Sequence, residues 1–215
     1  IQWNHPNMPW DATELWVADF SDGSTSNARR VAGDREEALL QPDWSPSGRL
    51  HVISDRSGWW NLYAVDAFDA SGGATFTEVR TGAFDIGGPM WVFGQSAYAF
   101  CTDAAGTETV VVDRDVLNIS SDPTCLRPRG DRVVIAGASW HHETQVAERG
   151  PDGSVTVLRA ARDLGLDPAF FPAPEPITFP TGPLDAEPDA SAGASAGADH
   201  EVAHGLFYRP ANPGF

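Results

Sequence analysis

The stretch QPDWSPSGRLHVISDRSGWWNLYAVD, residues 41–66, holds two apolar runs with a turn between them. The runs RLHVISDR (49–56) and WNLYAVDA (60–67) are rich in β-branched and aromatic residues, which favour strands. The intervening Ser57-Gly58 pair is a turn signal, and two such runs joined by Ser-Gly predict a β-hairpin. This hairpin decides the fold class, because similar short runs and turns continue on both sides of it.

Comparable strand signals dominate the chain up to about residue 160. The runs RRVAG, FTEVRTG and VTVLRAA close successive groups of these segments, so we predict them as outer strands. No long amphipathic helix is expected before residue 160, and a short one is expected at 160–166. The other predicted strands are TELWVADF (13–20), PMWVFG (89–94), SAYAFCTD (96–103), TETVVVDRD (107–115), DRVVIAGA (131–138) and ETQVAER (143–149).

The strands are grouped in a repeat. Pro42-Asp43-Trp44 recurs as Pro89-Met90-Trp91, and turns and strands follow each triplet. A four-stranded unit that recurs every ~40–50 residues predicts the blades of a β-propeller. We place units at about 1–33 (incomplete), 38–80, 87–119 and 124–160. The fold class is therefore all-β, a partial (open) propeller of about three to four four-stranded blades, and we expect further blades before Ile1.

Composition excludes several classes of partner. The chain has 215 residues and a formal net charge of −16, which would repel the phosphates of nucleic acid. It lacks a run of 18 apolar residues, so we expect no membrane partner. Cys101 and Cys125 are too few for a disulfide framework, and we expect two free thiols.

The motifs within 41–66 are Pro-x-Trp-Ser-Pro-x-Gly, Ser-Asp-Arg-x-Gly and Asn-Leu-Tyr, and together they resemble a TolB-type propeller repeat. With the segments quoted below, the chain resembles the later part of the propeller of prolyl oligopeptidase-family serine peptidases, in the acylaminoacyl-peptidase and dipeptidyl-aminopeptidase group. The segments are HPNMPWDATELWVADF (5–20), GGPMWVFGQSAYAF (87–100), PEPITFPT (174–181) and LFYRPANPGF (206–215).

The resemblance implies a domain order and a function. The propeller would occupy 1–160 and a linker 161–173, and an α/β-hydrolase domain would start at 174–215. That start would contain strands at about 174–181 and 203–210 around a low-complexity acidic loop at 183–200. The propeller would gate the access of short peptides to a Ser-His-Asp triad outside this chain, so the chain alone would be inactive. Its partners would be the catalytic domain and a short peptide, and the protein would be cytoplasmic. Triad chemistry needs no cofactor, and none is expected.

Two alternatives to the gating function stay open. One is a stand-alone TolB-like propeller that binds a protein or a peptide, and the other is a truncated relic without function. The tail at 174–215 favours the peptidase, because a pure propeller has no use for it.

The segment GASAG (193–197) spells the Gly-x-Ser-x-Gly pattern of a serine hydrolase nucleophile. That turn requires a strand before it and a helix after it, but here the flanks are rich in Ala, Gly, Ser and Asp. We therefore predict a linker, with no catalytic role for Ser195.

Two loops contain the candidate substrate-binding residues. Glu36-Glu37 is a carboxylate pair suited to an ammonium group, and aminopeptidases of the resembled family hold a substrate's amino terminus with propeller acids. His5 and Asn7 lie in the polar-aromatic segment NHPNMPWD, which would line the channel. A solvated loop and a plain connection are the respective alternatives.

Two further clusters are predicted to be structural. His141-His142-Glu143 could suggest a metal site, but neighbouring side chains in a strand point to opposite faces and rarely bind one ion, so we expect a polar cluster in a loop or at a blade edge. In SDRSGWW (54–60) we expect a turn in which Asp55 accepts backbone N–H groups and Arg56 pairs locally.

Overall fold

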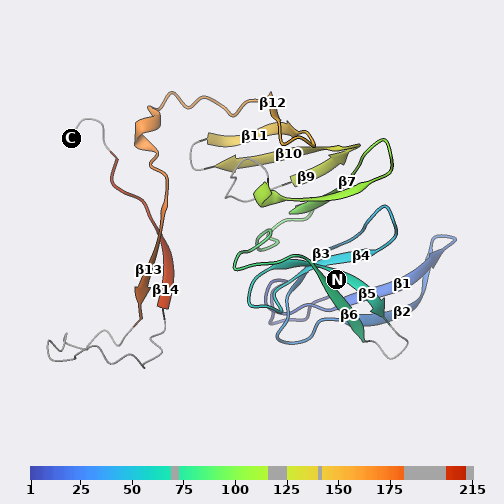
Figure 1. Cartoon of the computed structure of the whole chain (residues 1–215). Coiled ribbons are helices and arrows are strands. Elements are labelled where there is room, and N and C mark those ends of the chain that lie inside the picture. The colour runs from blue at the N-terminus through green and yellow to red at the C-terminus, as the bar shows by residue number, and fades with distance from the viewer. Residues whose placement is uncertain (69–72, 116–124, 140–141, 182–201, 212–215) are drawn as a thin grey trace. The chain divides into compact units, whose positions relative to one another are not determined.

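The computed structural model describes residues 1–68, 73–115, 125–139, 142–181 and 202–211. It divides into two compact units, Ile1–Arg162 and Asp163–Phe215. Within the described ranges, regular structure is almost entirely antiparallel β-sheet (Figure 1). The all-β prediction is therefore confirmed. None of the described residues forms a helix long and apolar enough to cross a membrane.

The first unit contains four sheets, two with four strands and two with two, among the described residues. In each sheet, strands that follow one another in the sequence lie side by side, as expected of a chain that folds back at short turns. The sheets are β1 (Leu15–Ser21) with β2 (Ser24–Ala32); β3 (Leu39–Trp44), β4 (Leu50–Ser54), β5 (Asn61–Phe68) and β6 (Ala74–Arg80); β7 (Tyr98–Thr102) with β8 (Glu108–Val112); and β9 (Cys125–Arg129), β10 (Arg132–Ser139), β11 (His142–Arg149) and β12 (Val155–Arg159).

The predicted hairpin is β4–β5. Leu50 pairs with Val65 and Ser54 pairs with Asn61, and Gly58 takes a left-handed φ of 83° in the turn between them. Every residue of β4 is buried, because this strand has neighbours on both edges and sheets on both faces. Two of the three predicted outer strands are also confirmed, since β6 and β12 lie at the edges of the two four-stranded sheets. The third, RRVAG, falls at the end of β2, which belongs to a two-stranded sheet.

Edge strands of three successive sheets, β3, β7 and β9, run in parallel. Near the start of β3, Gln41 bonds to the start of β7, and beyond the end of β3 Ser47 Oγ donates to Glu108, which lies opposite the end of β7. Ser96 forms a parallel bridge with Cys125 at the start of β9. Inner strands that run side by side in one direction, with each sheet extending away from them, are the arrangement of propeller blades. The prediction of a partial, open propeller is therefore confirmed.

Three apolar clusters fill the spaces between neighbouring sheets. The cluster between β7–β8 and β9–β10 includes Cys101, whose thiol is buried and bonds to the Arg132 carbonyl at 3.2 Å. Both cysteines are free thiols, and burial raises the pKa of Cys101. The largest side chains buried in the three clusters are Leu15, Leu39, Ile53, Leu62, Ile86, Tyr98, Leu126 and Ile135.

The prediction of a strand at 89–94, which starts with the second Pro-x-Trp triplet, is wrong, because these residues form turns. Trp91 N donates to Pro89 O in a turn, and Gly94 has a left-handed φ of 87°. The strand that lies beside β3 is instead β7. Trp91 is therefore not structurally equivalent to Trp44. Its ring packs at a tilt of 50° against that of Trp10, with the ring centroids 4.4 Å apart.

The short helix expected at 160–166 is also absent from the described residues there. Asp163 Oδ1 accepts the Gly165 N–H in a local turn, and Gly165 has a left-handed φ of 67°. The nearest helical turn is a 3₁₀ turn at Pro168–Phe170. An aspartate–glycine turn at this point interrupts the pattern that suggested a helix.

The second unit contains an antiparallel pair, β13 (Glu175–Pro180) with β14 (Val202–Phe207). The predicted second strand of this pair begins one residue earlier and ends at Phe207, before Pro210. Ile177, Phe179 and Leu206 expose between 41 and 60% of their surface. The loop at 183–200 and GASAG with Ser195 lie outside the described residues. The assignment of this unit to a hydrolase domain, and the predicted domain boundaries, stay predictions.

Gly33 provides a test of the close approach between the end of β2 and the segment that precedes β1. Both Gly33 and Gly23 have left-handed φ values (83° and 76°), but a Cβ on Gly33 would lie 2.0 Å from the Thr13 carbonyl oxygen, whereas a Cβ on Gly23 would meet nothing within 4 Å. We expect Gly23→Ala to cost about 1–2 kcal/mol of unfolding free energy, and Gly33→Ala about 4 kcal/mol or more because backbone must also move. Urea denaturation of the two variants measures this, and equal losses would contradict the close approach.

Candidate functional site

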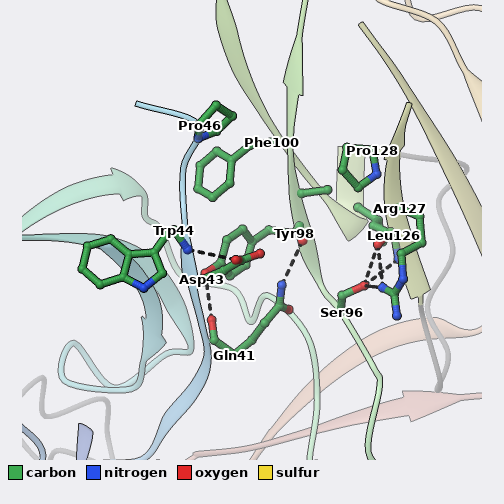
Figure 2. A pocket seen from close by; sticks show the side chains of 11 residues that line it. Gln41, Asp43, Trp44, Pro46, Ser96, Tyr98, Phe100, Leu126, Arg127 and Pro128 are labelled. Carbon is green, nitrogen blue, oxygen red and sulfur yellow. Dashed lines mark hydrogen bonds between the residues drawn. The ribbon is translucent and has the colours of Figure 1, made fainter. Parts of the chain in front are cut away.

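A pocket of about 380 Å³ opens where β3, β7 and β9 meet (Figure 2). Its size falls within the usual range for small-ligand sites. It is walled by three strands from three different sheets, so its shape depends on how those sheets pack. The lining residues are Gln41, Asp43, Trp44, Pro46, Ser96, Tyr98, Ala99, Phe100, Leu126, Arg127 and Pro128.

A bulge in β3 forms the first wall. The register of β3 on β4 shifts between Leu40 and Asp43, and Gln41 has a left-handed φ of 45°. This turns the Gln41 amide away from its own sheet. Its Nε2 donates to the Tyr98 carbonyl at 2.9 Å, and its Oε1 accepts the Ala97 N–H at 2.6 Å. The amide thereby takes the place of a strand partner for β7.

Aromatic side chains of β7 form the floor. Tyr98 is 1% exposed, and its hydroxyl lies 2.7 Å from the Gln41 carbonyl and 3.2 Å from the His51 carbonyl. Burial raises the pKa of Tyr98 far above its usual value, so it stays a neutral hydrogen-bond donor. The ring of Phe100 packs edge-on against Tyr98, with the ring centroids 5.6 Å apart, and lies tilted against His51, with the centroids 4.7 Å apart.

The third wall comes from β9 and the segment before β7. Ser96 Oγ donates to the Leu126 carbonyl at 2.7 Å. Arg127 Nη1 donates to Ser96 Oγ and to the Leu126 carbonyl, and Nη2 donates to the Gly94 carbonyl at 2.9 Å. All three acceptors are neutral, so these contacts orient the guanidinium without neutralising its charge.

The pocket offers charged and polar groups that can contact a ligand. Asp43 is the one carboxylate and Arg127 the one cation among the lining residues. Ser96 is the one hydroxyl nucleophile of that set apart from the Tyr98 phenol, and no imidazole lines the pocket to activate it. Among the described residues, no cluster of three or more His, Cys, Asp or Glu side chains is placed to hold a metal.

The structure places Glu37, one of the predicted substrate-binding acids, in a structural ion pair. Its Oε1 accepts Ser54 Oγ at 2.5 Å and Arg56 Nη2 at 2.6 Å. The Arg56 guanidinium also lies 3.3 Å from the ring centroid of Phe76. The turn itself forms, since Gly58 N donates to the Asp55 carbonyl. The predicted local pairing is wrong, because Asp55 Oδ1 accepts the N–H of Ala38 and Arg56 pairs with Glu37, both far from the turn in the sequence.

The other predicted residues lie on exposed or half-exposed loops. Glu36 is exposed and its N–H donates to Asp34, His5 is exposed, and the half-buried Asn7 donates its N–H to the Asn4 carbonyl. None of His5, Asn7, Glu36 and Glu37 is among the residues that line the pocket. A role for these four at a substrate amine stays a prediction.

The structure describes only part of the cluster His141-His142-Glu143. His141 lies outside the described residues, and His142 Nδ1 lies 2.8 Å from the Glu143 carbonyl. The Glu143 carboxylate pairs with Arg162 at 2.8 Å. This is a local polar arrangement at the edge of the first unit.

Three solved structures are similar to this chain. A crystal structure of puromycin hydrolase is 29% identical with a TM-score of 0.70, and a puromycin hydrolase mutant complexed with PGG is 26% identical with a TM-score of 0.66; both alignments cover 98% of this chain and 32% of that chain. A puromycin-hydrolyzing peptidase of Mycobacterium tuberculosis is 26% identical with a TM-score of 0.71 over 99% of this chain and 32% of that chain. No family model and no curated protein matches the sequence.

The likeness agrees with the sequence resemblance at the level of the family. The similar proteins are hydrolases, one of them a peptidase, and nearly the whole of this chain aligns with part of each. The chain spans about a third of their length. The structure is thus that of a propeller segment of a peptidase-like protein.

Tyr98→Phe tests whether the hydroxyl joins two sheets. Removing it leaves the Gln41 and His51 carbonyls without this donor, which we expect to cost about 1–3 kcal/mol of unfolding free energy. Tyr208→Phe, at a ring that is 52% exposed, is the matched control and is expected to change stability by less than about 0.5 kcal/mol. Chemical denaturation measures both, and a neutral Tyr98→Phe would show that the hydroxyl bonds contribute nothing net.

His51 predicts a pH dependence of stability. Burial lowers its pKa from the ordinary value of 6.5, so the unfolded chain binds a proton more readily than the folded one. The stability that neutral His51 contributes is therefore present above pH 6.5 and is lost as the pH falls through the lower folded pKa. We expect the stability advantage of the wild type over His51→Gln to shrink between pH 7.5 and pH 5, measured by thermal unfolding. A constant difference across this range would contradict the shift.

Proposed function

We propose that this chain is a non-catalytic propeller segment that gates the access of short peptides to a Ser-His-Asp triad located outside it. The observation that carries the proposal is the pocket on β3, β7 and β9, which combines binding groups of both charges with no activated nucleophile. The likeness to solved peptidase and hydrolase chains three times longer supports a partner portion that does the chemistry. The finer assignment is to the acylaminoacyl-peptidase and dipeptidyl-aminopeptidase group.

The arrangement of the inner strands supports the proposed gating. β3, β7 and β9 offer a shared surface of limited size, and a folded protein cannot enter a pocket of about 380 Å³. The net charge of −16 favours positively charged over negatively charged ligands. A short peptide with a free amino terminus is small enough for the pocket and carries a positive charge.

The second candidate is a stand-alone TolB-like module that binds a peptide. The observation in its favour is that the first unit, Ile1–Arg162, has its own apolar clusters between all neighbouring sheets. Such a unit could bind a ligand without any catalytic partner.

A chimera separates the two candidates. The portion of puromycin hydrolase that aligns with this chain is replaced by this chain, and puromycin hydrolysis is measured together with gel filtration. We expect measurable turnover by the chimera and none by this chain alone or by an enzyme that lacks the portion. As a second arm, this chain is expressed separately with the remaining portion and tested for co-purification. A monodisperse but inactive chimera, or failure in both arms, would refute the gating role and leave the binding module.

A further inference from the structure

We propose that the pocket on β3, β7 and β9 binds short peptides through both of their free ends. Asp43 holds the amino terminus, and Arg127 holds the terminal carboxylate. The inference rests on the proposed function only for the choice of a peptide as the ligand. Figure 2 shows the two charged side chains on different walls, Asp43 on the β3 side and Arg127 on the β9 side, with Tyr98 between them.

Asp43 is available to an ammonium group. It follows the bulge of β3, it is exposed, and its Oδ1 accepts the Trp44 N–H at 2.9 Å. Among the described residues no arginine or histidine forms an ion pair with it, whereas the carboxylates of Glu37, Asp66 and Glu148 are each paired with an arginine. A carboxylate has room for about four hydrogen bonds, so most of its capacity remains for a ligand.

Arg127 is available to a carboxylate. A guanidinium has five N–H donors, and three of those of Arg127 are used on the neutral acceptors of Ser96, Leu126 and Gly94. The Nε hydrogen and one Nη2 hydrogen remain. No carboxylate pairs with Arg127 among the described residues, although acids outnumber bases by 30 to 14 in this chain. A cation that is held rigidly by neutral groups in so acidic a protein is suited to binding an anion.

The rings of Trp44 and Phe100 also line the pocket, and they offer apolar surface to the middle of a short peptide.

The binding test uses isothermal titration calorimetry on the 215-residue chain at low ionic strength. The probes are trialanine, N-acetyl-trialanine and trialanine amide. We expect free trialanine to bind, and each capped peptide to bind about fivefold more weakly, as exposed charge pairs allow at low salt. Because the amide-capped peptide keeps its positive charge, its loss of affinity separates recognition by Arg127 from general attraction to an acidic protein.

Variants of the two charged residues test which of them binds each end of the peptide. Asp43→Asn is expected to bind trialanine about as weakly as the wild type binds the acetylated peptide, with no further loss on acetylation. Asp22→Asn, the same charge change at the exposed β1–β2 turn, is expected to leave binding unchanged. Arg127→Lys is expected to lose the preference for the free carboxylate, because a lysine lacks the planar fork.

Several results would overturn the proposal. These are equal binding of free and capped peptides, tighter binding of the amide, unchanged binding by Asp43→Asn, and no detectable binding by a chain whose unfolding is cooperative. The chimera experiment reads hydrolysis and this one reads the ligand on the isolated chain. Failure here with an active chimera would therefore refute the two-ended site alone.

Discussion

The side-chain amide of Gln41 joins two sheets that share no strand ladder. It donates to the Tyr98 carbonyl and accepts the Ala97 N–H, and the Tyr98 hydroxyl bonds back to the Gln41 carbonyl. This reciprocal arrangement requires the bulge and the left-handed backbone of Gln41. The β3 wall of the pocket depends on this arrangement, because the same bulge determines where the side chains of Asp43 and Trp44 lie.

Similar polar side chains connect the other sheets. Thr13 Oγ1 donates to the Leu39 carbonyl and accepts the Leu39 N–H, and Ser96 Oγ donates to the Leu126 carbonyl. Apolar packing between blades has little directional preference, whereas these bonds fix which residues of neighbouring inner strands face one another. The pocket is therefore built by contacts between sheets, and each sheet alone would lack it.

The dependence of the pocket on contacts between sheets explains which features the sequence could predict. The β4–β5 hairpin and the outer strands β6 and β12 follow from alternation and turn residues within a few positions, and they were predicted correctly. The segment at 89–94 shares a Pro-x-Trp triplet with β3, but whether a segment becomes an inner strand is decided by partners far along the chain. Gln41 selects β7 for that place through contacts more than fifty residues away.

The candidate site was missed for the same reason. In the sequence Asp43 stands out only as the middle residue of the Pro-x-Trp triplet, and Arg127 lies in the predicted unit at 124–160 without any motif around it. Their pairing on one pocket depends on the parallel alignment of β3, β7 and β9, for which no local pattern exists. Glu37 is the opposite case, a residue that stands out in the sequence but lies away from the pocket. Its carboxylate forms an ion pair with Arg56.

The buried thiol of Cys101 gives the molecule a built-in reporter. It lies between β7–β8 and β9–β10 and bonds to the Arg132 carbonyl, while Cys125 is more accessible. A thiol reagent can reach Cys101 only when these two blades separate, since burial both shields the sulfur and disfavours the reactive thiolate. The rate of its modification, compared with that of Cys125, would therefore measure how often neighbouring blades part in solution.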